Sequence, residues 1–127
     1  MILGLGIDIV DIHRVKRIAG EYGDDLLRRV FTEREAEYCR AKKNPEINLA
    51  ARFAAKEAFL KALGTGLRGK IEWREIEVVN DHLGKPSFEL YGAAREALSA
   101  KGAAYVHLSI THTADYAAAV VVVEERL

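Results

Sequence analysis

The chain has 127 residues, half of them apolar, which predicts a single domain over residues 1–127 with a proper hydrophobic core. Lys plus Arg and Asp plus Glu both number 19, so the net charge is zero, which argues against a general nucleic-acid binder. The single cysteine excludes an internal disulfide and fits a reducing cytoplasm.

No membrane anchor or leader is expected from the sequence. No apolar run reaches the length of a membrane span. Residues 1–7 lack the basic start and the cleavage site of a signal peptide. These features predict a cytoplasmic protein without contact with a membrane.

The first segment, Ile2 to Val10, is rich in Ile, Leu and Val, which predicts a buried strand. Asp8 interrupts it, and a buried carboxylate is costly unless it is paired, hydrogen-bonded or bound to a metal. Alternatively, Asp8 lies at the strand end and accepts backbone hydrogen bonds. Asp11 then has the position of a helix N-cap.

A short helix is predicted from Asp11 to about Tyr22, with a helical apolar stripe at positions 12, 15 and 18. Arg14 and Arg17 project from it, and Arg28 follows soon after. These charges form either an ordinary solvated face or a local basic patch suited to an acidic partner.

Thr32 and Glu35 have the spacing of a capping box, which marks the start of the next helix. This pattern predicts a helix from Glu33 to about Lys42, in which Thr32 and Glu35 are structural. Cys39 on this helix is predicted to be an inert, buried thiol.

The central element is a helix predicted to begin at Asn44, as the cap, with Pro45 in the first helical position, and to stop at Gly64. Its inward arc holds Leu49, Phe53, Leu60 and Leu63, with Phe59 at the edge. Arg52 and Lys56 fall inside this apolar arc, where their stems could simply snorkel over the core. Glu57 and Lys61 lie one turn apart beside small alanines. They form either an ordinary i,i+4 ion pair or a charged site where the small alanines leave room for another group to approach.

The rest of the chain alternates turns with short periodic segments. Three glycines in residues 64–69 predict a loop with exposed backbone amides, a weak phosphate-binding signal. Strands are predicted over 71–80, 86–90, 105–111 and 116–124, and a helix over 92–102. The predicted architecture is α+β, a small and mostly antiparallel sheet packed with helices.

The ordered set of motifs resembles the holo-acyl-carrier-protein synthases, which are small 4′-phosphopantetheinyl transferases. The matching stretches are Gly4–Val10, Phe31–Glu35, Arg52–Ala58 running to Gly64–Gly66, Asp81–Pro86 and Leu108–Thr113. They span nearly the whole chain in the family's order. The resemblance implies the fold of these transferases and the transfer of 4′-phosphopantetheine from coenzyme A to a serine of an acyl carrier protein, in support of fatty acid biosynthesis.

The resemblance also implies Mg²⁺ as cofactor and adenosine 3′,5′-bisphosphate as the released product. Asp8 and Glu57 match the metal-binding pair, which suits Mg²⁺ because this ion prefers oxygen ligands. Lys61, one turn beyond Glu57, is implied to reach the same phosphates. The base that activates the carrier serine is either Glu57 or a water on the metal, and the sequence does not choose between them.

Further positions match the family's binding residues. Those implied to line the coenzyme A site are Arg52, Lys61, Gly64, Lys85, Pro86, His112 and Thr113. Arg14 matches a carrier-protein contact, with Arg17 and Arg28 as weaker candidates. The family implies a homotrimer with active sites between protomers. Two rival interpretations are a non-catalytic module that binds coenzyme A or a nucleotide, and an interaction protein that binds neither.

Overall fold

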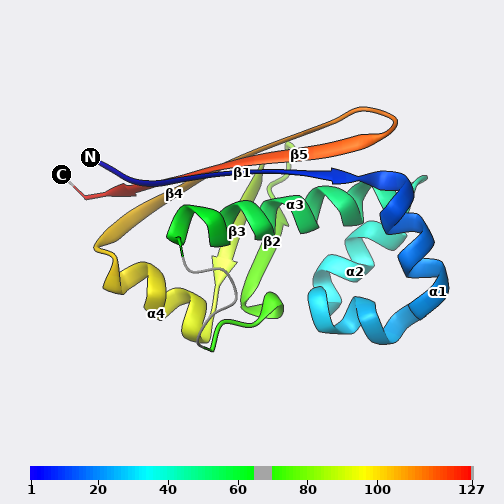
Figure 1. Cartoon of the computed structure of the whole chain (residues 1–127), viewed down its shortest axis with the longest axis horizontal. Coiled ribbons are helices and arrows are strands. Elements are labelled where there is room, and N and C mark those ends of the chain that lie inside the picture. The colour runs from blue at the N-terminus through cyan, green and yellow to red at the C-terminus, as the bar shows by residue number, and fades with distance from the viewer. Residues whose placement is uncertain (65–69, 127) are drawn as a thin grey trace.

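The main sheet of the computed structural model, which describes residues 1–64 and 70–126, has three antiparallel strands in the order β1-β5-β4. These are β1 (Ile2–Asp11), β5 (Tyr116–Glu125) and β4 (Ala103–His112), and β5 pairs with both neighbours. Alternate residues of β5 are fully buried, as expected for a strand with one face on a core. Both chain termini lie at the same end of this sheet (Figure 1).

A separate hairpin is formed by β2 (Ile76–Asn80) and β3 (Pro86–Leu90), and is followed by α4 (Gly92–Ala100). The predicted α+β class is therefore confirmed, although the strands divide into two sheets and not one. The strand expected from residue 71 begins only at Ile76. The preceding residues Trp73–Glu75 form a 3₁₀ turn, η1, because the Glu75 carboxylate accepts the backbone N–H of Glu72.

Helix α3 (Pro45–Leu63) lies under the main sheet, and the hairpin covers another of its sides (Figure 1). Pro45 is in the first turn, and Gly64 ends the helix in the left-handed conformation at φ 78°, as predicted. Asn44 occupies the predicted N-cap position, although its side chain makes no capping hydrogen bond. Phe59, expected at the edge of the apolar arc, is fully buried, because α3 packs on more than one side.

Two helices extend the end of the molecule beyond β1. Helix α1 (Ile12–Val30) was expected to end near Tyr22, but a second helical segment follows a break at Gly23, whose φ of 63° favours glycine. Asp11 caps it by accepting two backbone N–H groups, as predicted. Helix α2 (Glu33–Arg40) has the predicted capping box of Thr32 and Glu35.

The single thiol lies in the core between these helices. Cys39 is 1% exposed, and burial raises its pKa to about 11. The predicted buried thiol is thus confirmed, with little reactive thiolate at neutral pH. Among the described residues, no helix combines the length and the apolar character needed to cross a membrane.

Candidate active site

Two glycines of β1 allow this strand to approach α3 far more closely than side chains would permit. Gly4 and Gly6 are two residues apart, so both face the same side of the strand. A Cβ atom on Gly6 would overlap the carbonyl oxygen of Ala58, and one on Gly4 would overlap that of Ala62. The backbone of β1 therefore lies directly against α3, and the next residue on this side is Asp8.

The close approach brings Asp8 to the charged flank of α3. Lys61 Nζ lies 3.0 Å from Asp8 Oδ1 and also donates to the carbonyl of Ile7 at 3.1 Å. Glu57 lies one turn before Lys61 on the same flank. Partial burial and then the charge of Asp8 raise the pKa of Glu57, and Lys61 partly opposes this. Two carboxylates and one ammonium thus share a small volume.

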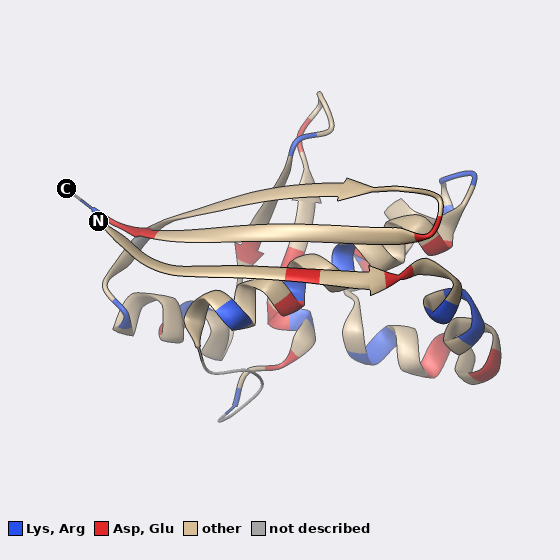
Figure 2. Cartoon of the chain, turned by 45° about the horizontal axis from the view of Figure 1, so that its top comes forward, with Lys and Arg blue, Asp and Glu red and all other residues tan. Residues whose placement is uncertain are grey.

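The two carboxylates open into a cleft of about 510 Å³ beside α1. Asp8, Glu57 and Arg14 line it, together with Phe53 and Tyr116. Figure 2 shows the acidic positions of β1 and α3 side by side and the basic positions of α1 at the end of the strand. The predicted metal pair is therefore brought together, and a predicted carrier contact lies beside it.

The donor set at this cleft suits Mg²⁺. Among the described residues, no three His, Cys, Asp or Glu side chains gather as a metal cluster. Mg²⁺ does not need such a cluster, because it keeps several waters and is usually held by one or two carboxylates plus substrate phosphates. Asp8 and Glu57 supply the two carboxylates, and burial followed by the nearby charge of Asp8 raises the pKa of Glu57, so a cation between them would stabilise its ionised form.

Two other cations of α3, Lys56 and Arg52, are buried on a different side, which excludes the alternative that they only snorkel over the core. Lys56 is fully satisfied, because its Nζ donates to Glu35 at 2.7 Å and to the carbonyls of Val30 and Trp73. Burial lowers the pKa of Lys56, and Glu35 opposes this. This ion pair is structural, and Glu35 extends it by accepting the N–H of Val78.

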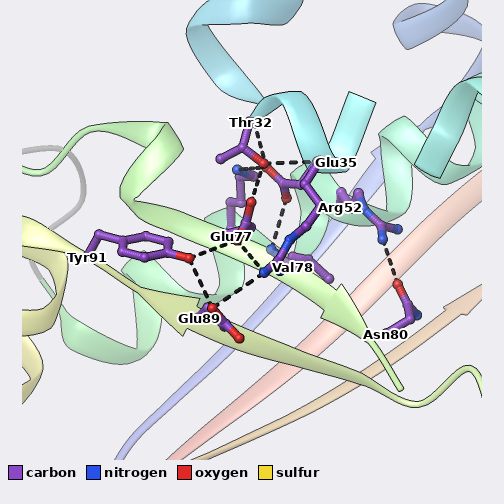
Figure 3. Close-up of polar contacts among 10 residues, drawn as sticks. Thr32, Glu35, Arg52, Glu77, Val78, Asn80, Glu89 and Tyr91 are labelled. Atoms are coloured by element: carbon purple, nitrogen blue, oxygen red, sulfur yellow. Dashed lines mark hydrogen bonds and ion pairs between the residues drawn. The ribbon is translucent and has the colours of Figure 1, made fainter. Parts of the chain in front are cut away.

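A neighbouring polar network joins α2 to the hairpin (Figure 3). Glu77 accepts hydrogen bonds from the Thr32 hydroxyl, from Arg34 at 2.7 Å and from the Tyr91 hydroxyl at 3.0 Å. Desolvation of Glu77 is outweighed by these donors, which lower its pKa. The Tyr91 hydroxyl also donates to Glu89, and its hydrogen bonds to Glu89 and then to Glu77 raise the pKa of Tyr91 to about 12. The network holds the hairpin against α2 and the buried side of α3.

Arg52 differs from Lys56, because in the described part of the chain it has no carboxylate partner. It is 4% exposed, and it donates to Asn80 Oδ1 at 2.6 Å, as Figure 3 shows. Its guanidinium carbon lies 4.0 Å from the centre of the Tyr38 ring. Its Nε atom is buried without a hydrogen-bond partner among the described residues. Such an uncompensated buried cation is costly unless an anion arrives to pair with it.

Asn80 links Arg52 to the predicted hairpin residues. The Asn80 amide donates to the carbonyl of Gly84, and the carboxylate of Asp81 accepts the N–H of Lys85. Lys85 is exposed at the hairpin tip and Pro86 opens β3. Arg52, Lys85 and Pro86 thus form one group on the hairpin side of α3.

His112 and Thr113 lie at the turn between β4 and β5. His112 is exposed, and the Thr113 hydroxyl accepts the backbone N–H of Asp115 and Tyr116, which shapes the turn. Gly64 ends α3 as described. The rest of the predicted phosphate loop, residues 65–69, lies outside the described residues.

The predicted site residues therefore fall into groups on different sides of α3. At about 100° per residue, Arg52 points about 140° away from Glu57 and about 180° away from Lys61. Contacts agree with this geometry, because Arg52 reaches the hairpin while Lys61 reaches β1. Within one chain, Arg52 and Lys61 do not converge on a common point.

The three predicted carrier contacts are also spread out. Arg14 lines the cleft with Asp8 and Glu57. Arg17 is exposed on the same half of α1. Arg28 lies in the second half of α1, 3.8 Å from Asp25 in an exposed ion pair. Arg14 is the one of the three that adjoins the candidate metal pair.

Comparison with known proteins identifies the class that this fold and site define. A model of the 4′-phosphopantetheinyl transferase superfamily matches residues 4–121, and the chain belongs to this family.

More particular relatives are the holo-[acyl-carrier-protein] synthases. The synthase of Geotalea daltonii is 52% identical over 98% of this chain and all of its own length. The crystal structure of the synthase from Neisseria meningitidis is 40% identical with a TM-score of 0.91, covering 98% of this chain and all of that one. A Bacillus anthracis synthase, described as a complex with coenzyme A (3′,5′-ADP), is 35% identical with a TM-score of 0.81 and covers 99% of both chains.

Sequence reasoning missed two residues of this region, Tyr38 and Asn80, which contact Arg52. Asn80 comes directly before the Asp81 turn, so an Asn at the end of a predicted strand was the available signal. Tyr38 carried no signal, because its contact with Arg52 depends on how α2 packs against α3.

Proposed function

We propose that this protein transfers the 4′-phosphopantetheine group of coenzyme A to a serine of an apo acyl carrier protein and releases adenosine 3′,5′-bisphosphate. The observation that carries the proposal is the pair of Asp8 and Glu57 in one cleft, with Lys61 bound to Asp8, in a chain that belongs to the phosphopantetheinyl transferases. Its full-length relatives named as holo-[acyl-carrier-protein] synthases support the same reaction. Such a protein would work in the cytoplasm, in fatty acid biosynthesis.

In this reaction the serine oxygen attacks the β-phosphorus of coenzyme A and the bond from that phosphorus to the bridging oxygen breaks. Lys61 donates to the pyrophosphate, whose leaving oxygen gains charge in the transition state. Glu57 takes the serine proton. Its raised pKa makes it a stronger base than an exposed glutamate.

Asp8 and Glu57 would hold Mg²⁺, which when bound neutralises charge on the pyrophosphate. Lys61 is a counter-charge of Asp8. The ammonium is half exposed, so it can turn from Asp8 toward a phosphate that enters the cleft.

The nucleotide end of coenzyme A is assigned to Arg52, Lys85, Pro86, His112 and Thr113, with Gly64 closer to the pyrophosphate. Arg52 pairs with the 3′-phosphate, because it is a buried guanidinium without a carboxylate partner among the described residues. His112 is exposed and available to the same phosphate.

The site is proposed to lie between protomers of a homotrimer. The 3′-phosphate and the pyrophosphate belong to one small nucleotide, yet Arg52 and Lys61 point to opposite sides of α3. A second copy can supply the missing side. The outer face of β1 offers a surface for that copy, because Leu5, Ile7 and Ile9 are 64–66% exposed and lie beside Val120 and Val122 of β5.

Complementation tests the shared site. We expect co-expressed Glu57→Gln and Arg52→Gln chains to recover activity, since a mixed trimer contains interfaces with one intact side from each chain. The measurement is transfer rate per protomer in purified mixed trimers, whose mass is checked by sedimentation. Glu57→Gln mixed with Lys61→Ala is the control, because both lesions are on the same side and no interface is restored. Equal inactivity in both mixtures would contradict the shared site.

The carrier protein is proposed to dock on α1. Acyl carrier proteins are acidic, and this chain has no net charge with which to attract one. Attraction must come from local basic residues, of which Arg14 is beside the cleft. Arg17 and Arg28 extend the basic surface along α1. A carrier docked here brings its serine toward Asp8 and Glu57.

For Arg14→Glu we expect a raised KM for the carrier protein and an unchanged affinity for coenzyme A. Exposed charges steer association and are screened by salt, at a Debye length of about 10 Å in 0.1 M salt. The salt dependence of kcat/KM should therefore become flatter. Arg95→Glu, an equal charge change on exposed α4, is the control. A normal carrier KM with an unchanged salt slope would place docking elsewhere on the surface.

The direct test of the function is mass spectrometry of an apo carrier protein incubated with this protein, coenzyme A and Mg²⁺. The expected result is a mass gain of one phosphopantetheine group, lost when EDTA is added. Binding of coenzyme A without a mass gain would favour a non-catalytic module. No binding at all would favour an interaction protein.

A further inference from the structure

The surroundings of Arg52 form a built site for one anionic group. A hollow of about 160 Å³ is lined by Arg34, Tyr38, Arg52, Val78, Val79 and Asn80. Arg34 is already compensated, because it pairs with Glu77 at 2.7 Å and with Glu89 at 3.4 Å. In the described part of the chain, the cation of this hollow without a carboxylate partner is Arg52, with a buried, unpaired Nε.

The guanidinium of Arg52 is held at two points. Asn80 Oδ1 accepts from one terminal nitrogen at 2.6 Å. The Tyr38 ring lies 4.0 Å from the guanidinium carbon, the distance of a close cation–π contact. The same ring also attracts Lys42, whose Nζ lies 4.5 Å from the ring centre. A planar guanidinium stacked on a ring keeps its edge donors free for an oxyanion.

We infer that Tyr38 is a positioning residue whose ring fixes Arg52 for the 3′-phosphate, so that Tyr38 determines the preference for 3′-phosphorylated nucleotides. This inference rests on the proposed function and names the residue that makes its phosphate site selective. The ring face carries the effect, because no hydrogen bond of the Tyr38 hydroxyl is found among the described residues. The ring also offsets part of the cost of burying Arg52 without a carboxylate.

The test separates the ring from the hydroxyl. Tyr38→Phe keeps the ring, and Tyr38→Leu removes it at similar apolar bulk. Binding of adenosine 3′,5′-bisphosphate and of adenosine 5′-monophosphate is measured by calorimetry. KM is measured for coenzyme A and for its 3′-dephospho form. We expect Tyr38→Leu to lose about 2- to 30-fold in affinity for the 3′-phosphorylated ligands, the range of a cation–π contact.

The monophosphate and the dephospho substrate should bind Tyr38→Leu as they bind the wild type, with kcat unchanged. Tyr38→Phe should keep the full preference, and Arg52→Gln should abolish it. A Tyr38→Leu variant that retains the preference, or that weakens binding of both nucleotides equally, overturns the inference.

Failure of the two proposals can be told apart. Wild-type protein that binds the bisphosphate selectively but transfers nothing contradicts the proposed function and leaves the role of Tyr38 standing. Transfer that continues with an unchanged 3′-phosphate preference in Tyr38→Leu contradicts the role of Tyr38 alone. An unchanged preference in Arg52→Gln removes both Arg52 and Tyr38 from the phosphate site.

Discussion

Asp8→Asn and Glu57→Gln should each lower the transfer rate by about 100-fold or more, the loss that follows when a group stabilising transition-state charge is removed. Each substitution keeps the shape of the side chain and deletes one negative charge from the cleft. Asp8→Asn should also raise the Mg²⁺ concentration that gives half-maximal rate, because the amide is a weaker ligand than the carboxylate. Steady-state kinetics over a Mg²⁺ series measures both effects.

The fold should survive these two changes. Asp8 loses its ion pair with Lys61, but that pair is partly solvated and a loss of about 1 kcal/mol or less is expected. Glu46→Gln, on the first turn of the same helix, is the matched control and should keep the wild-type rate. Wild-type rates at limiting Mg²⁺ in both Asp8→Asn and Glu57→Gln would show that the metal assignment is wrong.

Local sequence signals predicted most of the elements correctly. The Thr32–Glu35 capping box and the Gly64 stop depend on chemistry within a few residues, so the sequence alone predicted them. The predicted ends of elements were wrong where contacts with residues far along the chain determine where an element begins. Glu75 bonds the N–H of Ala93, far along the chain, and this helps to hold residues 73–75 out of the strand.

The candidate site was predictable only in part for the same reason. A carboxylate in an apolar strand made Asp8 conspicuous, and its partner Lys61 is 53 positions away in the chain. The roles of Arg52 and Lys56 looked alike from their spacing on α3. Their difference arises from packing, because Glu35 of α2 reaches Lys56 while Tyr38 of the same helix stacks on Arg52.

The whole active-site geometry depends on how closely β1 lies against α3, so Gly6→Ala should be among the most damaging single substitutions. The added methyl would overlap the backbone carbonyl of Ala58, which cannot rotate away as a side chain would. Overpacking that shifts backbone costs about 1–3 kcal/mol and occasionally more, and a fixed carbonyl in the way favours the upper end of this range. The displaced strand would also carry Asp8 away from Glu57 and Lys61, so the remaining folded protein should transfer slowly.

Urea unfolding at one fixed protomer concentration measures the first effect, since assembly makes stability depend on concentration. Gly20→Ala is the matched control, because Gly20 is exposed in α1 and its methyl would meet nothing within 4 Å. That control should be stabilised by about 0.5–1 kcal/mol, the ordinary gain of alanine over glycine in a helix. If Gly6→Ala were as stable and active as Gly20→Ala, β1 could shift from α3 at no cost. The tight contact would then not be what places Asp8 beside Lys61.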